Sequence, residues 1–248
     1  MLNKGEIIKN FSQSARDYDK HALLQKALAD ELFSSVPKLN PQKILDIGCG
    51  TGYLARRLAG RFPQAEVVGM DIAPGMIKVA SQRNRLENLA FVVDDGEELS
   101  FARHSFDLVV SNASLQWMDA EKVFGGAWKV LRPGGYFVFT TFGPRTLYEL
   151  RESGFRVNRF KSIGELKNLL GRKFKFNRME SNIATQKFRS VRELVCHLKE
   201  LGAQSLDRNL KPKQNVLQAF KEYKKNFGSN GYIIASYEVI LGFLITLD

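Results

Sequence analysis

The stretch Ile44–Gly52, which reads ILDIGCGTG, decides the fold of this 248-residue chain. It lies between a short apolar segment and an amphipathic one, so it is expected to join a first strand to a first helix. Its three glycines let the backbone turn sharply and approach a ligand closely: Gly48, Gly50 and Gly52. The dinucleotide-binding pattern G-x-G-x-x-G would need glycine where Tyr53 stands. Asp46, just before the turn, would repel a pyrophosphate but suits a ligand that carries an ammonium group.

Apolar strands alternate with helices from this turn onward. Strands are expected in five segments: Lys43–Asp46, Glu66–Asp71, Leu89–Val93, Phe106–Val110 and Tyr136–Phe142. Helices are expected between them: Tyr53–Phe62, Pro74–Gln82 and Glu121–Leu131. Later strands are predicted at Lys173–Lys187 and Tyr232–Leu247, with helices at Val191–Leu201 and Gln214–Phe227. The pattern predicts a Rossmann-like, doubly wound α/β fold with a mostly parallel seven-stranded sheet. Helical additions are expected at the N-terminus, over residues 6–34 with a break near 16–20, and between the last strands.

The composition is that of a globular chain whose positive charge is unevenly distributed. With 44% hydrophobic and 25% charged residues, the sequence is neither disordered nor of low complexity. We expect no transmembrane helix, no secretion signal and no metal site, and the two cysteines suit a reducing cytoplasm. Residues 1–142 carry 17 basic and 16 acidic side chains, whereas residues 143–248 carry 20 and 10. A basic surface for an acidic partner is therefore expected in the second part.

Further polar residues follow the other expected strands in order. Asp71 ends the second strand, where a carboxylate can hold both hydroxyls of a ribose. Asp94, Asp95 and Gly96 follow the third strand, and Ser111 with Asn112 the fourth. Together with the glycine turn, this order resembles the class I S-adenosylmethionine-dependent methyltransferases. The resemblance implies S-adenosylmethionine as cofactor, bound by residues of the core and of the front segment: Tyr18, His21, Asp46, Gly48, Gly50, Gly52, Asp71, Ile72, Asp95, Gly96 and Asn112.

Segments along nearly the whole chain extend the resemblance. They are FSQSARDYDKHALLQ (11–25), SNASLQW (111–117), FGPRTLYELRESG (142–154), VNRF (157–160), LKELGA (198–203) and YEVILG (237–242). They are similar to malonyl-acyl-carrier-protein O-methyltransferases of the biotin pathway. This resemblance implies a single domain over residues 1–248, with a helical lid at 1–40, a cofactor-binding core at 41–142 and a substrate- and partner-binding part at 143–248. The connection between TLYEL and VNRF is shorter than usual in that family.

The implied reaction methylates the free carboxylate of a malonyl thioester on acyl carrier protein. That carboxylate is ionised at pH 7, so the enzyme needs no general base and no catalytic triad. Cationic side chains are expected to anchor the carboxylate, and the candidates are Arg145, Arg159 and Lys199. Tyr18 can donate a hydrogen bond to it from the lid.

Two other functions are compatible with the sequence. One is a methyltransferase for a small free acid such as trans-aconitate, whose enzyme the SNASLQW segment also resembles. The other is a basic, S-adenosylmethionine-dependent RNA-binding protein, for which Phe174 and Phe176 among basic residues are the only aromatic support. We expect acyl carrier protein as partner, no nucleic acid, no membrane and a monomer. Carrier docking is expected at basic residues near the C-terminus: Lys211, Lys213, Lys221, Lys224 and Lys225.

Overall fold

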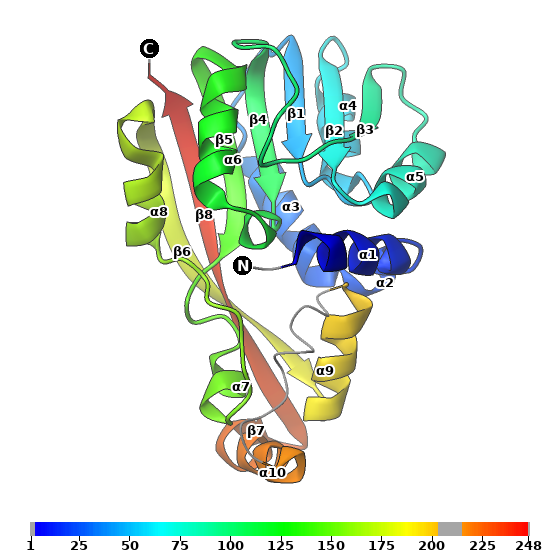
Figure 1. Ribbon diagram of the computed structural model, residues 1–248, viewed down its shortest axis with the longest axis vertical. Coiled ribbons are helices and arrows are strands. Elements are labelled where there is room, and N and C mark those ends of the chain that lie inside the picture. Colours follow the sequence, from blue (N-terminus) through cyan, green and yellow to red (C-terminus); the bar gives the residue numbers. More distant parts are fainter. Residues whose placement is uncertain (1–2, 203–214, 248) are drawn as a thin grey trace.

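The computed structural model, in which residues 3–202 and 215–247 are described, is built on one twisted sheet (Figure 1). Its strand order is β3-β2-β1-β4-β5-β8-β6. The strands are β1 (Lys43–Ile47), β2 (Glu66–Asp71), β3 (Leu89–Val93), β4 (Phe106–Asn112), β5 (Leu131–Phe142), β6 (Phe174–Phe188) and β8 (Tyr232–Thr246). The first five strands pair in parallel, and β8 runs antiparallel between β5 and β6. The predicted mostly parallel, doubly wound sheet is therefore confirmed, and a two-residue strand β7 (Gly228–Ser229) pairs with β8 in addition.

Helices cover both faces of the parallel part of the sheet. On one face, α3 (Leu23–Ser35) and α4 (Tyr53–Arg61) pack on inward-facing residues such as Ile44 and Leu108. On the other face, α6 (Ala120–Val130) and α8 (Ile163–Leu170) pack on Leu45 and Val109. Neighbouring residues of a strand thus serve opposite cores, because side chains alternate along a strand.

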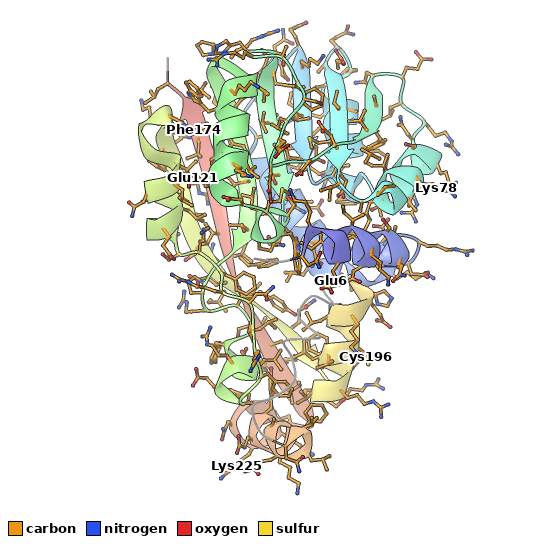
Figure 2. All side chains as sticks on the ribbon, viewed as in Figure 1. Glu6, Lys78, Glu121, Phe174, Cys196 and Lys225 are labelled. Carbon is orange, nitrogen blue, oxygen red and sulfur yellow. The ribbon has the colours of Figure 1, made fainter. Side chains whose placement is uncertain are left out.

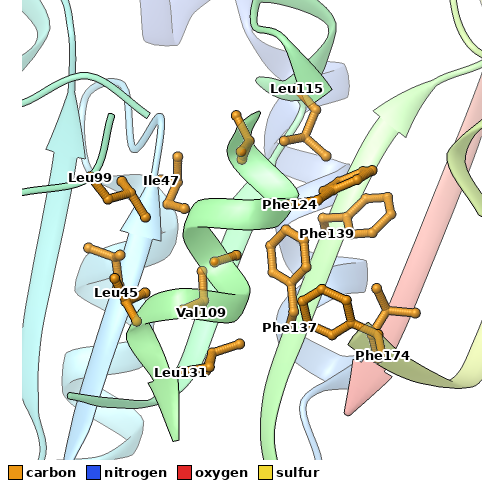
Figure 3. Close-up of a cluster of buried hydrophobic side chains, with 14 of the residues drawn as sticks. Leu45, Ile47, Leu99, Val109, Leu115, Phe124, Leu131, Phe137, Phe139 and Phe174 are labelled. Carbon is orange, nitrogen blue, oxygen red and sulfur yellow. The ribbon is translucent and has the colours of Figure 1, made fainter. Parts of the chain in front are cut away.

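The core beneath α6 is rich in aromatic side chains (Figure 3). The ring of Phe124 on α6 lies 5.9 Å from that of Phe137 and 5.7 Å from that of Phe139, both on β5. The three rings are buried, so this contact fixes the position of α6 against the sheet. The strand β5 begins earlier than predicted, at Leu131, and its pairing register with β4 shifts between Phe106 and Leu108.

The N-terminal helices cross the edge of the sheet where the parallel strands end (Figure 1). The predicted helix over 6–34 is divided into α1 (Lys4–Ser14), α2 (Tyr18–His21) and α3, with the break at the expected place. α5 (Pro74–Arg83) packs against α1, and the short 3-10 helix η1 (Leu115–Trp117) follows β4. In folds of this type, ligands bind at the carboxyl ends of the parallel strands.

The long strands β6 and β8 continue beyond the rest of the sheet and carry a second group of helices (Figure 1). These are α7 (Tyr148–Glu152), α9 (Val191–Glu200) and α10 (Val216–Phe227), while the 3-10 helix η2 (Gly171–Lys173) leads into β6. They share a separate apolar core that includes Leu150, Leu194 and Tyr223. The helices α9 and α10 were predicted, whereas α7 and α8 were not. No helix in the described part of the chain has the length and apolar character to span a membrane.

Candidate active site

The glycine turn after β1 has the left-handed backbone that only glycine adopts freely. Gly48, Gly50 and Gly52 have φ angles of +70°, +56° and +79°. A Cβ atom on Gly48 would lie 2.5 Å from Cβ of Ser114, and one on Gly52 would lie 2.5 Å from the Phe91 ring. At Gly50 such an atom would meet nothing within 4 Å, because this glycine faces open space. The turn therefore brings bare backbone to the edge of a cavity.

Asp71, at the end of β2, is held in place by the same turn. Its Oδ2 accepts a hydrogen bond of 3.0 Å from the backbone N–H of Gly50, and its Oδ1 accepts one of 2.9 Å from that of Ala73. Burial raises the pKa of Asp71 to about 6, although these two hydrogen bonds oppose the shift. Each carboxylate oxygen keeps a further lone pair, so the group can accept hydrogen bonds from two neighbouring hydroxyls.

Asp46, the last polar residue before the turn, is a buried carboxyl group. Its residue is 1% exposed, and neither oxygen has a hydrogen-bond partner of normal geometry among the described residues. Burial and then the negative charge of Asp71 raise the pKa of Asp46 to about 7, which the backbone N–H of Ala55 opposes only in part. A buried carboxylate needs a compensating cation, so this site fits a ligand with an ammonium group.

The loop after β3 connects this edge of the sheet to the N-terminal helix. Asp95 Oδ1 accepts a hydrogen bond of 3.0 Å from the backbone of Glu97, and Asp95 Oδ2 lies 2.7 Å from Nζ of Lys4 on α1. Lys4 also lies 2.9 Å from Glu97. Asp94 accepts hydrogen bonds from Ser100 Oγ and from the backbone of Asp95, so it closes its own loop. A Cβ on Gly96 would lie 2.7 Å from the Met118 sulfur and 3.0 Å from an Ile47 methyl group, so this loop packs closely against Met118.

Three adjoining cavities lie at this edge of the sheet. The Asp71 cavity is lined by predicted site residues together with apolar side chains: Tyr18, Gly48, Gly50, Asp71, Ile72, Asp95, Gly96, Asn112, Phe11 and Trp117. The Asp46 cavity lies under α3 and includes Asp46 and Gln25. The Tyr237 cavity lies between the N-terminal helices and the long strands and includes Gln186 and Tyr237. Tyr18 lines all three cavities, and so marks their junction.

Tyr18 and Asn112 secure the front segment at this junction. Burial and the negative charge of Asp71 raise the pKa of Tyr18, so its hydroxyl keeps its proton and can donate a hydrogen bond. Asn112 Nδ2 donates a hydrogen bond of 2.9 Å to the backbone carbonyl of Gln25 on α3, and Asn112 Oδ1 accepts one of 2.7 Å from Thr140. The sequence did not single out Lys4 or Met118, which also line the Asp71 cavity.

Two predicted cofactor residues lie outside these cavities. Gly52 is the N-cap of α4, where its positive φ starts the helix. Nδ1 of His21 lies 2.9 Å from Oε2 of Glu200, and this contact joins α2 to α9. His21 thus connects the N-terminal helices to the second group of helices and lines none of the three cavities.

None of the three predicted cationic anchors lines the Tyr237 cavity as described. The Arg145 side chain is 62% exposed and lies 3.6 Å from Glu238. The Arg159 side chain is 85% exposed and lies 2.6 Å from Glu165, beside a groove next to α8. Lys199 lies on α9 and is engaged by an interaction of its own. Two of these cations are thus drawn to acidic partners, and the geometry does not favour an anchoring role.

The comparisons with known proteins agree with this geometry. The family described as "Methyltransferase domain" matches residues 45–139. A structure of a putative Haloferax volcanii methyltransferase with its Trm112 activator has a TM-score of 0.64 at 17% identity, covering 96% of this chain and 98% of that one. Geranyl diphosphate C-methyltransferase from Streptomyces coelicolor, solved with S-adenosyl-L-homocysteine, has a TM-score of 0.59 at 16% identity, covering 89% and 79%. The fold and the carboxylate-flanked glycine turn define an S-adenosylmethionine-dependent methyltransferase of class I.

Relatives of known name are similar over almost the whole chain. "Malonyl-[acyl-carrier protein] O-methyltransferase 2" of Ilyobacter polytropus is 34% identical and covers 97% of each chain. A Bacillus cytotoxicus protein named "Malonyl-[acyl-carrier protein] O-methyltransferase" is 30% identical, covering 97% of this chain and 91% of its own. The chain therefore belongs to the malonyl-[acyl-carrier protein] O-methyltransferase family.

Proposed function

We propose that the protein transfers a methyl group from S-adenosylmethionine to the free carboxylate of a malonyl thioester on acyl carrier protein. The methyl ester would then prime synthesis of the pimeloyl chain of biotin. The observation that carries the proposal is the junction at Tyr18, where the Asp71 and Asp46 cavities meet a third, largely apolar cavity. A methyl donor held in the first two cavities would face an acceptor in the third.

The chain's own residues supply binding and orientation. We assign the amino-acid end of the cofactor to Asp46, the ribose to Asp71, and the adenine to the loop with Asp95 and Gly96. Bound S-adenosylmethionine supplies a sulfonium-activated methyl group, which is a strong electrophile. The malonyl carboxylate is already ionised at neutral pH, so the protein has only to orient it and exclude water.

We propose that residues 1–40 act as the lid that excludes this water. Two sets of contacts hold α1 over the sheet edge, one near each end of this helix. Lys4 reaches Asp95 and Glu97, and the backbone N–H of Gly75 donates to Ser12 Oγ at 3.3 Å. A Cβ on Gly75 would lie 2.5 Å from the backbone oxygen of Ser12, so α1 and α5 approach as closely as backbones can.

The partner is proposed to reach the site along the groove beside α8. This groove shares Gln116, Phe142 and Phe160 with the Tyr237 cavity, and Arg159 and Lys161 stand at its rim. An acidic carrier docked on these cations would send its thioester arm toward the junction. Lys221, Lys224 and Lys225 lie on α10, at the far end of the molecule, where Figure 2 labels Lys225. Lys211 and Lys213, the other predicted docking residues, lie outside the described residues.

The alternative functions receive less support. The ring of Phe174 is buried and lies 5.9 Å from that of Phe137, so it is not available for stacking on RNA bases. A small free acid would not need the long groove beside α8.

We also propose a monomer in the cytoplasm, where the two free cysteines, buried Cys49 and exposed Cys196, would stay reduced.

Transfer of a radiolabelled methyl group tests the function. The enzyme should be offered malonyl carrier protein, malonyl-CoA, free malonate, trans-aconitate and RNA at equal concentrations. We expect label in malonyl carrier protein at the highest kcat/KM and none in RNA. Preferential labelling of a free acid or of RNA would contradict the proposal.

A further inference from the structure

The described residues contain a small set of buried side-chain oxygen atoms that lack a hydrogen-bond partner. They are Gln25 Oε1, both carboxylate oxygens of Asp46, Gln186 Oε1 and the hydroxyl of Tyr237. Every one of these residues lines the Asp46 cavity or the Tyr237 cavity. Buried polar groups are nearly always paired with protein or with ordered water in folded proteins, so these atoms mark places where water or a ligand supplies the partner. The ammonium group of the cofactor accounts for Asp46, and the other three residues remain.

These three residues reach the Tyr237 cavity from the long strands and from the lid. Tyr237 on β8 pairs with Ala184 on β6, and Gln186 pairs with Ala235, so Tyr237 and Gln186 are diagonal neighbours on one face of the sheet. Gln25 comes from α3, where Asn112 holds its backbone carbonyl. Tyr237 is 5% exposed and its ring lies 6.0 Å from that of Phe142, which fixes the direction of its hydroxyl.

The described lining of the Tyr237 cavity is polar at these points and carries no positive charge. It includes no lysine, arginine or histidine, and aromatic and leucine side chains make up most of the wall. Burial, and then the negative charge of Glu149, raise the pKa of Tyr237. Its hydroxyl therefore remains a hydrogen-bond donor throughout the neutral range. The unpaired atoms of Gln25 and Gln186 are amide oxygens, which accept; turning either amide about its last bond exchanges the oxygen with the NH₂ group, which then donates to an acyl oxygen.

We propose that Tyr237, Gln186 and Gln25 form the subsite for the acyl group of the acceptor, and that this neutral subsite selects acyl groups with a single carboxylate. The inference rests on the proposed function, because it names what binds beside the methyl donor. Tyr237 donates a hydrogen bond to an oxygen of the acyl group, and the amides contact its remaining polar atoms. Neutral donors leave the attacking carboxylate oxygen nucleophilic, whereas a tightly paired guanidinium would hold its electron pair.

The same chemistry explains how the enzyme would reject a free dicarboxylic acid. Malonate carries two charges at neutral pH, and the second one would be buried in a cavity that offers no cation. In the malonyl thioester that second group is uncharged. The selection therefore follows both from the absence of a cation in the described lining and from the neutral hydrogen-bond donors.

A pair of matched tyrosine variants tests the subsite. Tyr237→Phe removes the unpaired hydroxyl, whereas Tyr223→Phe removes a hydroxyl on α10 that donates to the carbonyl of Ile234 at 2.7 Å and does not line the cavity. We expect Tyr237→Phe to lower kcat/KM for a small malonyl thioester about 10- to 100-fold, with unchanged cofactor affinity and a Tm at or above wild type. Tyr223→Phe should lower Tm and leave kcat/KM near wild type.

Binding to the enzyme saturated with S-adenosylhomocysteine gives a second measurement that needs no turnover. We expect calorimetry to detect binding of monomethyl malonate, which has one carboxylate, and little or no binding of malonate. Tyr237→Phe should weaken the first, and Gln186→Lys should strengthen the second. Equal binding of both acids, or wild-type binding and kinetics in Tyr237→Phe, would overturn the subsite. Selective binding without methylation of malonyl carrier protein would instead overturn the proposed function and keep the subsite.

Discussion

The proposed cofactor-binding edge and the proposed subsite in the Tyr237 cavity would recognise ligands by opposite means. The first presents the buried Asp46, the half-buried Asp71 and bare backbone from one glycine turn, all within 26 consecutive residues of the sequence. The second is neutral and largely apolar, and it is assembled from Gln25, Gln186 and Tyr237, which lie far apart in the chain. A ligand with a fixed positive charge can be recognised by a short motif. An acceptor that must stay reactive is recognised by a pocket that only the complete fold creates.

The largest effect is expected from a substitution at the proposed cofactor-binding edge. Asp71→Ala removes the acceptor for both ribose hydroxyls, and a hydrogen bond to a charged group is worth about 1.5–3 kcal/mol. We expect S-adenosylhomocysteine to bind about 100-fold more weakly, measured by calorimetry. Binding of monomethyl malonate should need more S-adenosylhomocysteine but should otherwise be normal. Unchanged cofactor affinity in a folded variant would remove Asp71 from the site.

The pH dependence of cofactor binding gives a second test of the roles of Asp46 and Asp71. With pKa values of about 7 for Asp46 and about 6 for Asp71, both groups must lose a proton before they act as carboxylates. Cofactor affinity should therefore rise roughly tenfold between pH 6 and 7 and level off above it. Asp46→Asn should bind weakly and show a shallower rise of about twofold over this range, which Asp71 still contributes. A flat profile in the wild-type protein would contradict the assignment.

The stability of the cofactor-free protein should change with pH in the opposite direction. Both pKa values are raised above the ordinary value of 3.8, so the folded state holds protons that the unfolded chain has lost. This contribution is fully present below pH 3.8 and is lost as pH rises through about 6 and 7. Denaturant unfolding of wild type and Asp46→Asn should show a smaller loss of stability between pH 5 and 8 in the variant.

Charge reversal tests whether the carrier protein docks at the groove that leads to the Tyr237 cavity. Arg159 and Lys161 are exposed on the loop that lines the groove beside α8, whereas Lys224 and Lys225 are exposed on α10. Replacing either pair by glutamate changes the net charge equally. We expect the loop pair to lower kcat/KM for malonyl carrier protein roughly tenfold at low salt, with little effect on a small malonyl thioester. Equal effects of the two pairs would place docking elsewhere.

The smallest effect is expected where the lid meets the cofactor edge. The Lys4 side chain is 43% exposed, and exposed ion pairs contribute about 0–1 kcal/mol. Lys4→Ala should weaken cofactor binding only two- to threefold, and added salt should remove even that difference. A loss comparable to that of Asp71→Ala would mean that the lid, rather than the sheet edge, dominates cofactor binding.

Sequence could predict the part of the site that depends on local order. Asp46, the glycines and Asp71 follow their strands directly, and the parallel sheet brings those strand ends together. The capping box of Ser162 and Glu165 also marks the start of α8 and could have been recognised in the sequence. The proposed subsite could not be predicted, because Tyr237 stands in an apolar strand and resembles a core residue until its pairing with β6 is known. The partner of Arg145 is Glu238 on β8, far along the chain, so it likewise depends on a tertiary contact.

The atom that receives the transferred methyl group gives the clearest test of the proposed function. Malonyl carrier protein should be incubated with the enzyme and cofactor labelled with ¹³C in the methyl group, and the product examined by NMR before and after mild base hydrolysis. The account predicts a methyl ester on the malonyl carboxylate, with all of the label released as methanol. Label that stays on the α-carbon of the malonyl group, or no labelled carrier at all, would contradict it.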